Sequence, residues 1–262
     1  MGIRRRTGRW GGLLLVACVA LSGSMIQAAE WEWTVAPYLW AAGAGLDVEI
    51  NDDPVLEGDI AFTDLLDKLE IAGMVHFEGR TGRTGFFVDG AYLSLSDSMT
   101  FTEDLPLFPD GGEVDSEMKM GRYETVGFYR FPGERSAFDL FLGVRVVDFD
   151  QRVEISRMEP EPAETSASAS DTLLDGFLGA RFGTEFGKRY WFNIRGDIGT
   201  GDTELSWTAN AGIGVWLGQH RKYGLELLYE HFEMEVEDLG DLVDVKSTCQ
   251  LSGPLFGLVI QW

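Results

Sequence analysis

The sequence predicts an all-β protein, an antiparallel transmembrane β-barrel, and three observations support this. Many segments alternate apolar and polar residues, the N-terminus resembles an export signal, and the alternation runs to the last residue. In the final segment Phe256, Leu258, Ile260 and Trp262 share one strand face. A lipid-facing strand must present an apolar side chain at every second residue while its backbone groups pair with neighbouring strands.

The N-terminal segment predicts a secretory signal peptide over residues 1–29. Four arginines at positions 4–9 precede an apolar stretch at 11–21 and a tail rich in small residues, with cleavage expected after Ala28 or Ala29. The apolar stretch is too short to span a membrane as a helix. We therefore expect Sec export, and residues 30–262 as a single barrel domain in the outer membrane of a Gram-negative cell.

Two rival interpretations fit this segment less well. Residues 15–18 (LVAC) resemble a lipid-attachment box at Cys18, but the apolar stretch continues beyond that cysteine. The arginine run also suggests twin-arginine export, which carries folded proteins, whereas a barrel must cross the inner membrane unfolded. Ordinary signal cleavage is favoured.

Composition excludes several classes of function. The net charge is −22, and without the four signal arginines it becomes −26. Such an acidic chain lacks the Lys/Arg clusters that bind nucleic acid. Only Cys249 remains after cleavage, so no internal disulfide can form. The aromatic content of 12% argues against disorder despite the charge.

The alternating segments predict ten strands, with boundaries uncertain by a few residues. Short connectors at 81–83, 132–137, 187–189 and 219–222 alternate with longer ones, and a tight turn at 199–202 lies on the long side. Without that turn, residues 190–218 would form one strand far longer than a membrane crossing. Ten strands are favoured and eight are the alternative. The predicted strands are 31–45, 70–80, 84–97, 116–131, 138–154, 172–186, 190–200, 204–218, 222–236 and 248–262.

The longer connectors, 46–69, 98–115, 155–171 and 237–247, are predicted to be loops on the extracellular side. The first two are rich in Asp and Glu, and 159–170 has the Pro, Glu, Ala and Ser content of a mobile loop. Within the first, residues 63–69 predict a short helix with Thr63 as its N-cap.

Charged residues fall opposite the lipid-facing positions, so they should line the lumen. They predict a network of salt bridges that fills the barrel, or alternatively a narrow pore lined by charged rings. The predicted network consists of Glu78, Arg80, Asp89, Arg122, Glu124, Asp139, Arg145, Asp175, Arg181, Arg195, Asp197, Glu226 and Glu230.

The histidines raise the question of catalysis. His76 lies beside Glu78 on an inward face, His220 in a periplasmic turn, and His231 near the outer rim beside Glu233 and Glu235. No serine at a matching spacing along the chain accompanies His231. We therefore expect no catalytic residue, and no metal-binding or cofactor-binding residue and no cofactor, because no metal-ligand spacing, phosphate loop or nucleophile elbow occurs in a usable context.

Four segments together resemble a family of uncharacterised Gram-negative outer-membrane β-barrel proteins. They are residues 33–43 (WTVAPYLWAAG), 62–69 (FTDLLDKL), 193–199 (NIRGDIG) and 251–257 (LSGPLFG). The resemblance implies a barrel with a loop helix and supplies no catalytic residue.

The resulting expectation is a non-enzymatic, porin-like outer-membrane barrel that is structural or passes small solutes. The alternative is a rim enzyme, either a protease or a lipid A hydrolase. Expected partners are outer-membrane lipids, lipopolysaccharide and the barrel-assembly machinery, with no nucleic acid, and we expect a monomer.

Overall fold

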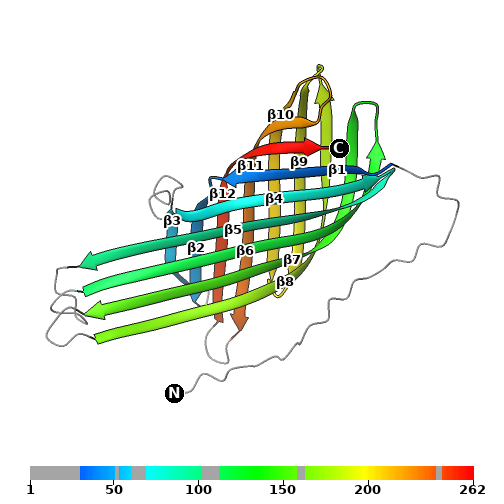
Figure 1. Ribbon diagram of the computed structural model, residues 1–262. Helices are drawn as coiled ribbons and strands as arrows, with labels where there is room; N and C mark the ends of the chain where they lie inside the picture. Colours follow the sequence, from blue (N-terminus) through cyan, green and yellow to red (C-terminus); the bar gives the residue numbers. More distant parts are fainter. Residues whose placement is uncertain (1–29, 51–52, 61–68, 102–111, 158–162, 240–243) are drawn as a thin grey trace.

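The protein is an all-β, closed antiparallel barrel (Figure 1). The computed structural model describes residues 30–50, 53–60, 69–101, 112–157, 163–239 and 244–262. These residues form twelve strands, and none of them is in a helix that could cross a membrane. The helix predicted over 63–69 lies outside the described residues except for Leu69, which begins a strand.

The strands are β1 (Glu32–Trp40), β2 (Gly43–Ile50), β3 (Asp53–Ile60), β4 (Leu69–Thr81), β5 (Thr84–Phe101), β6 (Gly112–Pro132), β7 (Ser136–Arg157), β8 (Ala163–Phe186), β9 (Tyr190–Gly201), β10 (Leu205–Leu217), β11 (Tyr223–Leu239) and β12 (Asp244–Gln261). From β4 to β12 the strands follow one another in chain order around the barrel, whereas β2 and β3 lie beyond β12.

The barrel closes between its first and last strands. β1 pairs with β4 on one side and with β12 on the other, and Trp33 and Trp262 exchange backbone hydrogen bonds of 2.9 and 3.1 Å. β2 continues along β12 where β1 ends, and β3 pairs with β2. The closed barrel therefore has ten strands, β1 and β4–β12, as the sequence predicted, and the eight-strand alternative is wrong.

Short turns join the strands at one end of the barrel. Gly82 and Gly187 adopt φ values of 59° and 63°, which a residue with a side chain rarely adopts, so glycine suits these tight reversals. The start of β1 at Trp33 and the last residue, Trp262, lie at this same end. We call it the turn end of the barrel.

At the opposite end the predicted long loops are wrong in extent, because the strands continue into them. β5 and β6 remain paired as far as Phe101 and Gly112, and β8 starts at Ala163, inside the segment expected to be a mobile loop. β2 and β3 form a hairpin within 46–69, and β11 and β12 pair as far as Leu239 and Asp244. Backbone pairing needs no apolar face, so the ladder continues where lipid no longer contacts the side chains.

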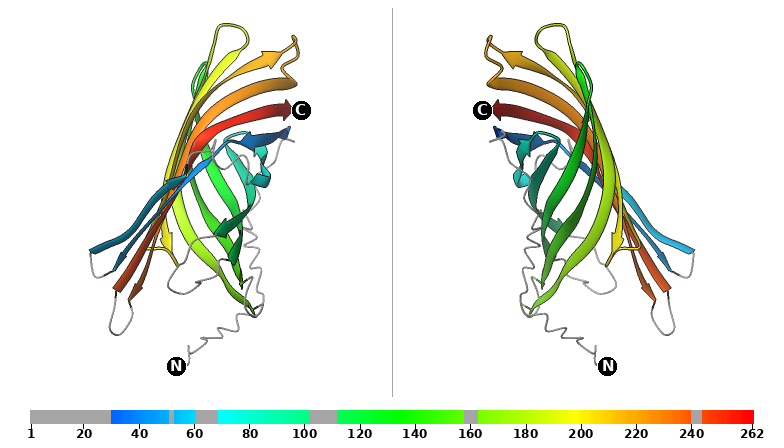
Figure 2. Two further views of the ribbon diagram at one scale, coloured as in Figure 1. Left: turned by 90° about the vertical axis from the view of Figure 1, so that its left-hand side faces the viewer. Right: turned by 90° about the vertical axis from the view of Figure 1, so that its right-hand side faces the viewer.

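A tight turn joins β9 and β10 as predicted, but it comprises residues 202–204 because β9 continues to Gly201, and β8 holds it in place. Asp202 accepts a hydrogen bond from the backbone N–H of Leu174 at 2.9 Å, and the Asp175 carboxylate accepts from the backbone and hydroxyl of Thr203 at 3.1 and 2.7 Å. The last residue of β9 pairs with Asp175. The first half of β8 therefore runs beyond β9, and β5–β8 project past this turn (Figures 1 and 2).

The outer wall carries a belt of exposed apolar side chains, as the alternation predicted. On β7, Leu142 is 72% exposed, whereas its inward neighbours Phe141 and Arg145 are 4% and 0% exposed. The same alternation continues on other strands. Further members of the belt are Val75, Val88, Tyr123, Phe138, Leu140, Val144, Leu174, Leu178, Phe182, Tyr190, Ile194, Ile198, Ile213, Leu217, Tyr223, Leu225, Leu227, Tyr229, Phe256, Leu258 and Trp262.

Replacing Leu142 with Arg tests the lipid-facing assignment of this belt. We expect the free energy of unfolding in lipid vesicles to fall by about 2–4 kcal/mol, because a cation would enter the hydrocarbon layer. Ser170→Arg is the control, because Ser170 is exposed beyond the belt, opposite Asp150. Urea titration followed by tryptophan fluorescence measures both variants. Equal effects of the two substitutions would show that the belt does not face lipid.

Candidate functional site

The inner wall is lined by charge. The predicted network residues lie on inward strand positions, and most are almost completely buried. Arg80 lies at the turn end, where it pairs with Glu32 and donates to the carbonyl of Gly82 instead of joining the central network. Its strand position faces inward, but β4 reaches the end of the barrel there.

Arg145 is at the centre of the lumen and makes hydrogen bonds in several directions. Its Nε donates to Glu124 at 2.8 Å and its Nη2 to Asp197 at 2.5 Å, and the side chain has no exposed surface. Ser206 and Thr208 accept two further bonds at 3.1 and 2.9 Å. Donors and acceptors come from β6, β7, β9 and β10, so one guanidinium connects opposite walls.

Arg195 lies next to Arg145 and shares its two carboxylates. Its Nη2 lies 2.6 Å from Glu124 and 2.8 Å from Asp197, and its Nη1 lies 3.1 Å from Asp89 on β5. Two guanidinium groups therefore clamp the same two carboxylates. Arg122 extends the chain of contacts on the other side, at 2.5 Å from Glu230.

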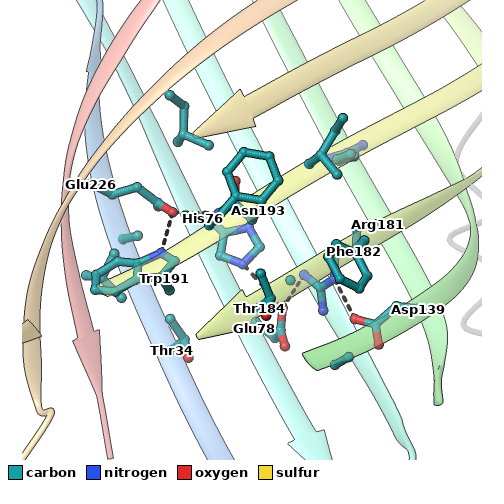
Figure 3. Close-up of a pocket in the computed structure, with 18 of the residues that line it drawn as sticks. Thr34, His76, Glu78, Asp139, Arg181, Phe182, Thr184, Trp191, Asn193 and Glu226 are labelled. Carbon is teal, nitrogen blue, oxygen red and sulfur yellow. Dashed lines mark hydrogen bonds and ion pairs between the residues drawn. The ribbon is translucent and has the colours of Figure 1, made fainter. Parts of the chain in front are cut away.

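Nearer the turn end, a second cluster continues the network (Figure 3). Arg130 makes a bidentate pair with Asp139 at 2.7 and 2.8 Å, and Arg181 bridges Asp139 and Glu78 at 2.6 Å each. Bidentate guanidinium–carboxylate pairs fix geometry as well as charge. Arg130 was not among the predicted residues, although it has the same inward parity as Arg122 and Glu124, because it lies close to the turn.

His76 joins the two clusters. Its Nδ1 lies 2.5 Å from Asp89 and its Nε2 lies 3.6 Å from Glu78. In the described part of the lumen, ion pairs connect five arginines, six carboxylates and this histidine, while Asp175 and Glu226 are held by neutral donors. The six carboxylates are Glu78, Asp89, Glu124, Asp139, Asp197 and Glu230.

Aromatic rings are interleaved with the guanidinium groups. Arg145 lies 4.5 Å from the ring centre of Phe177 and 5.2 Å from that of Phe232. Arg181 stacks on Phe128 at 4.6 Å. These stacks cover the faces of guanidinium groups whose edges donate hydrogen bonds. The predicted network contained charged residues alone and did not include these inward phenylalanines, which stack on its arginines.

Glu226 is held by neutral donors. Tyr38, Trp191 and Asn193 donate to its carboxylate at 2.6, 2.8 and 2.6 Å. Trp191 fits because Gly214 and Gly224 face it, and a Cβ at either glycine would overlap its ring. Alternation placed Asn193 on the inward face, but that these three donors meet Glu226 is clear only once strand register is known.

On the side of the central cluster away from the turn end the lumen contains apolar side chains, and on the side toward the turn end it contains a cavity. Away from the turn end, Met120, Val147, Phe232, Met234 and Leu251 form a buried apolar cluster inside the barrel with Cys249. Toward the turn end lies a cavity of about 650 Å³ lined by residues that include Tyr38, His76, Arg181, Trp191 and Glu226 (Figure 3). Turn residues 133–137 and Arg221 also line it, so the cavity reaches that end of the barrel.

The described residues hold no cluster of three or more His, Cys, Asp or Glu side chains arranged for a metal ion. The carboxylates of the lumen are instead engaged by arginine, histidine or neutral donors.

Comparison with known proteins identifies the fold. The outer-membrane protease OmpT from Escherichia coli superposes with a TM-score of 0.51, at 7% identity over 92% of this chain and 99% of that chain. The fold is that of an outer-membrane β-barrel. No family model matches the sequence, and no curated protein matches it. The family resemblance of the four segments is therefore supported only at the level of the outer-membrane barrel fold.

Other solved structures cover much of the chain with lower similarity. The Pseudomonas putida toluene transporter TodX matches at a TM-score of 0.34 and 8% identity over 88% of this chain and 90% of that chain. The attachment invasion locus protein Ail of Yersinia pestis matches at 0.30 and 11% identity, over 86% of this chain and 99% of that chain.

Replacing Arg145 with Ala tests whether the lumen network stabilises the barrel. We expect the free energy of unfolding to fall by about 3 kcal/mol, at the lower end of the range for a broken buried pair, since Arg195 still contacts both stranded carboxylates. The control is Arg221→Ala, which removes a pair with Glu185 of 2.6 Å in which both side chains are 43% exposed. That control should change stability by less than about 1 kcal/mol. Urea titration in vesicles measures both, and equal losses would contradict a buried network.

Proposed function

We propose that this protein is an integral outer-membrane barrel with a closed lumen, which acts as a membrane-embedded structural protein and not as a channel. The exposed apolar belt supports the membrane location, since so large a hydrophobic surface on the outer wall requires a lipid environment. The signal predicted over residues 1–29 supports export by the Sec route.

The proposal that the lumen is closed is supported by the burial of the side chains at its centre. Arg145 has no exposed surface and contacts groups from four strands, and the apolar cluster around Phe232 lies directly beyond it. A conducting pore requires a continuous aqueous path, whose lining side chains would be exposed to water. The lining of the cavity at the turn end includes none of the buried apolar residues Met120, Val147, Phe232, Met234 and Leu251. Of the two functions expected from sequence, structural use is therefore favoured over solute passage.

The proposed surroundings follow from the belt and the charge. The outer wall would contact phospholipid and lipopolysaccharide, and insertion would require the barrel-assembly machinery. We also propose a monomer, since a barrel closed by β1 and β12 has no open edge there that needs a second chain.

The likeness to a protease concerns the fold, because 7% identity carries over no residue. A closed lumen does not exclude a reaction at residues of the outer wall, because those residues do not use the lumen.

Single-channel recording in planar bilayers tests closure. We expect the refolded protein to produce no conductance steps. The matched variant carries Arg145→Ala and Phe232→Ala together, because Phe232 is fully buried and stacks on both Arg145 and Arg122. It should conduct under the same reconstitution conditions, while heat-dependent gel migration of the wild type shows that the silent protein is folded. Regular steps from the wild type would establish a pore.

Cell fractionation tests the location independently. The protein should be recovered with outer membranes and should migrate faster on gels before heating than after it, as folded barrels do. Recovery in the soluble periplasmic fraction would contradict the membrane proposal.

A further inference from the structure

A hydroxyl, an imidazole and a carboxylate meet on the outer wall of the barrel. On β11 and β12, Nδ1 of His231 lies 2.6 Å from Oγ of Ser252, and Nε2 of His231 lies 3.4 Å from Glu233. Strand pairing places His231 directly opposite Ser252. One ring nitrogen thus faces a hydroxyl and the other a carboxylate, which is the arrangement by which an imidazole activates a nucleophilic serine.

The imidazole is held by its neighbours. The ring of Trp207 on β10 lies against it, with the two centroids 4.5 Å apart. His231 is partly exposed, with a quarter of its side-chain surface accessible, and so is Glu233. The three groups are therefore fixed in position and still reachable from outside the barrel. His76 differs from His231, because it is enclosed in the lumen between two carboxylates.

The position of these groups along the wall indicates what they could meet. Tyr229, the last strongly exposed aromatic residue of the belt on β11, precedes His231 by two residues, and Phe256 on β12 follows Ser252 by four. Beyond His231 the same face carries Glu233 and Glu235. The site thus lies at the edge of the apolar belt away from the turn end, where the hydrocarbon layer gives way to headgroups. The ester carbonyls of membrane lipids lie at this depth.

We propose that Ser252, His231 and Glu233 form a nucleophilic triad that hydrolyses fatty-acyl esters of lipids in the outer leaflet. The inference is independent of lumen closure. It differs from the expected non-enzymatic barrel because no serine close to His231 along the chain indicated such a site. The serine lies 21 positions away and is brought opposite by the β11–β12 pairing.

The chemistry is acyl transfer to serine, followed by hydrolysis. Oγ of Ser252 attacks the ester carbonyl carbon as its proton passes to His231, and Glu233 stabilises the resulting imidazolium. The carbon–oxygen ester bond then breaks, and the leaving alcohol takes the proton from His231. Water, deprotonated by His231, attacks the acyl-serine, releasing the fatty acid and restoring the hydroxyl.

Neighbouring positions provide room and a hydrogen-bond donor. Gly43 and Gly45 of β2 pair with Ser252 and Gln250, so β2 presents no side chain beside the serine. Gln250 precedes Ser252 by two residues on the same strand face, and its amide is the group that the register places to donate to the developing oxyanion. The Gln250 amide would stabilise the negative charge on this oxygen by a hydrogen bond and would not exchange a proton with it.

The test uses the refolded full-length protein in detergent micelles with two long-chain substrates, a dioleoyl phospholipid and purified lipopolysaccharide. We expect release of fatty acid from at least one of these substrates. The substrate that is hydrolysed identifies which class of lipid the site accepts. Ser252→Ala and His231→Ala should each lower the rate by about a thousandfold, and Glu233→Gln by less. Thr248→Val is the control, because Thr248 lies on the same face of β12 and should leave the rate unchanged.

A second readout does not depend on turnover. A fluorophosphonate probe should label the wild type at Ser252, as located by peptide mass spectrometry, and should fail to label His231→Ala. Heat-dependent gel migration confirms that each variant is folded. No fatty-acid release together with no labelling of the folded wild type would overturn the triad, as would full activity in folded Ser252→Ala. The membrane location is tested separately by cell fractionation, whose result does not depend on hydrolysis in micelles.

Discussion

Burial of the Arg145 guanidinium is the constraint on which the interior depends. A cation without solvent contact must be matched by carboxylates and by acceptors for its remaining N–H groups, and Glu124, Asp197, Ser206 and Thr208 supply them. These partners come from strands on different sides of the barrel. The position of each strand relative to its neighbours is therefore tied to one central group, as well as to the backbone ladder.

The rest of the lumen extends this arrangement. Arg195 shares the carboxylates of Arg145, and His76 links Asp89 to the cluster of Arg130, Arg181 and Asp139 near the turns. Phenylalanine rings fill the space between guanidinium planes. A barrel interior of this width is narrow enough for side chains to meet across it, so charge and aromatic surface together replace the apolar core of a soluble protein.

The two walls of the barrel consequently have different properties. The inner wall is densely packed with charged and aromatic side chains at its centre, and a cavity lies toward the turn end. The outer wall is apolar in the belt and polar at the edge of the belt. There His231, Ser252 and Glu233 come together beside Trp207. The strands that carry these three outer residues also carry inward residues of the lumen network, such as Glu230 on β11, so both walls share one set of strands.

The sequence by itself determined the strand count, the facing of side chains and the inward charges, because alternation with a period of two assigns each residue to a wall. It predicted Arg145 and Asp197 as lumen residues without indicating that they meet. Partners such as Arg145 with Ser206, or His231 with Ser252, depend on strand register, which joins residues distant along the chain. The extent of β8 was likewise decided by pairing with β7, since polar segments such as 163–170 show no apolar period. Only tertiary structure could supply these contacts, because each is made between strands.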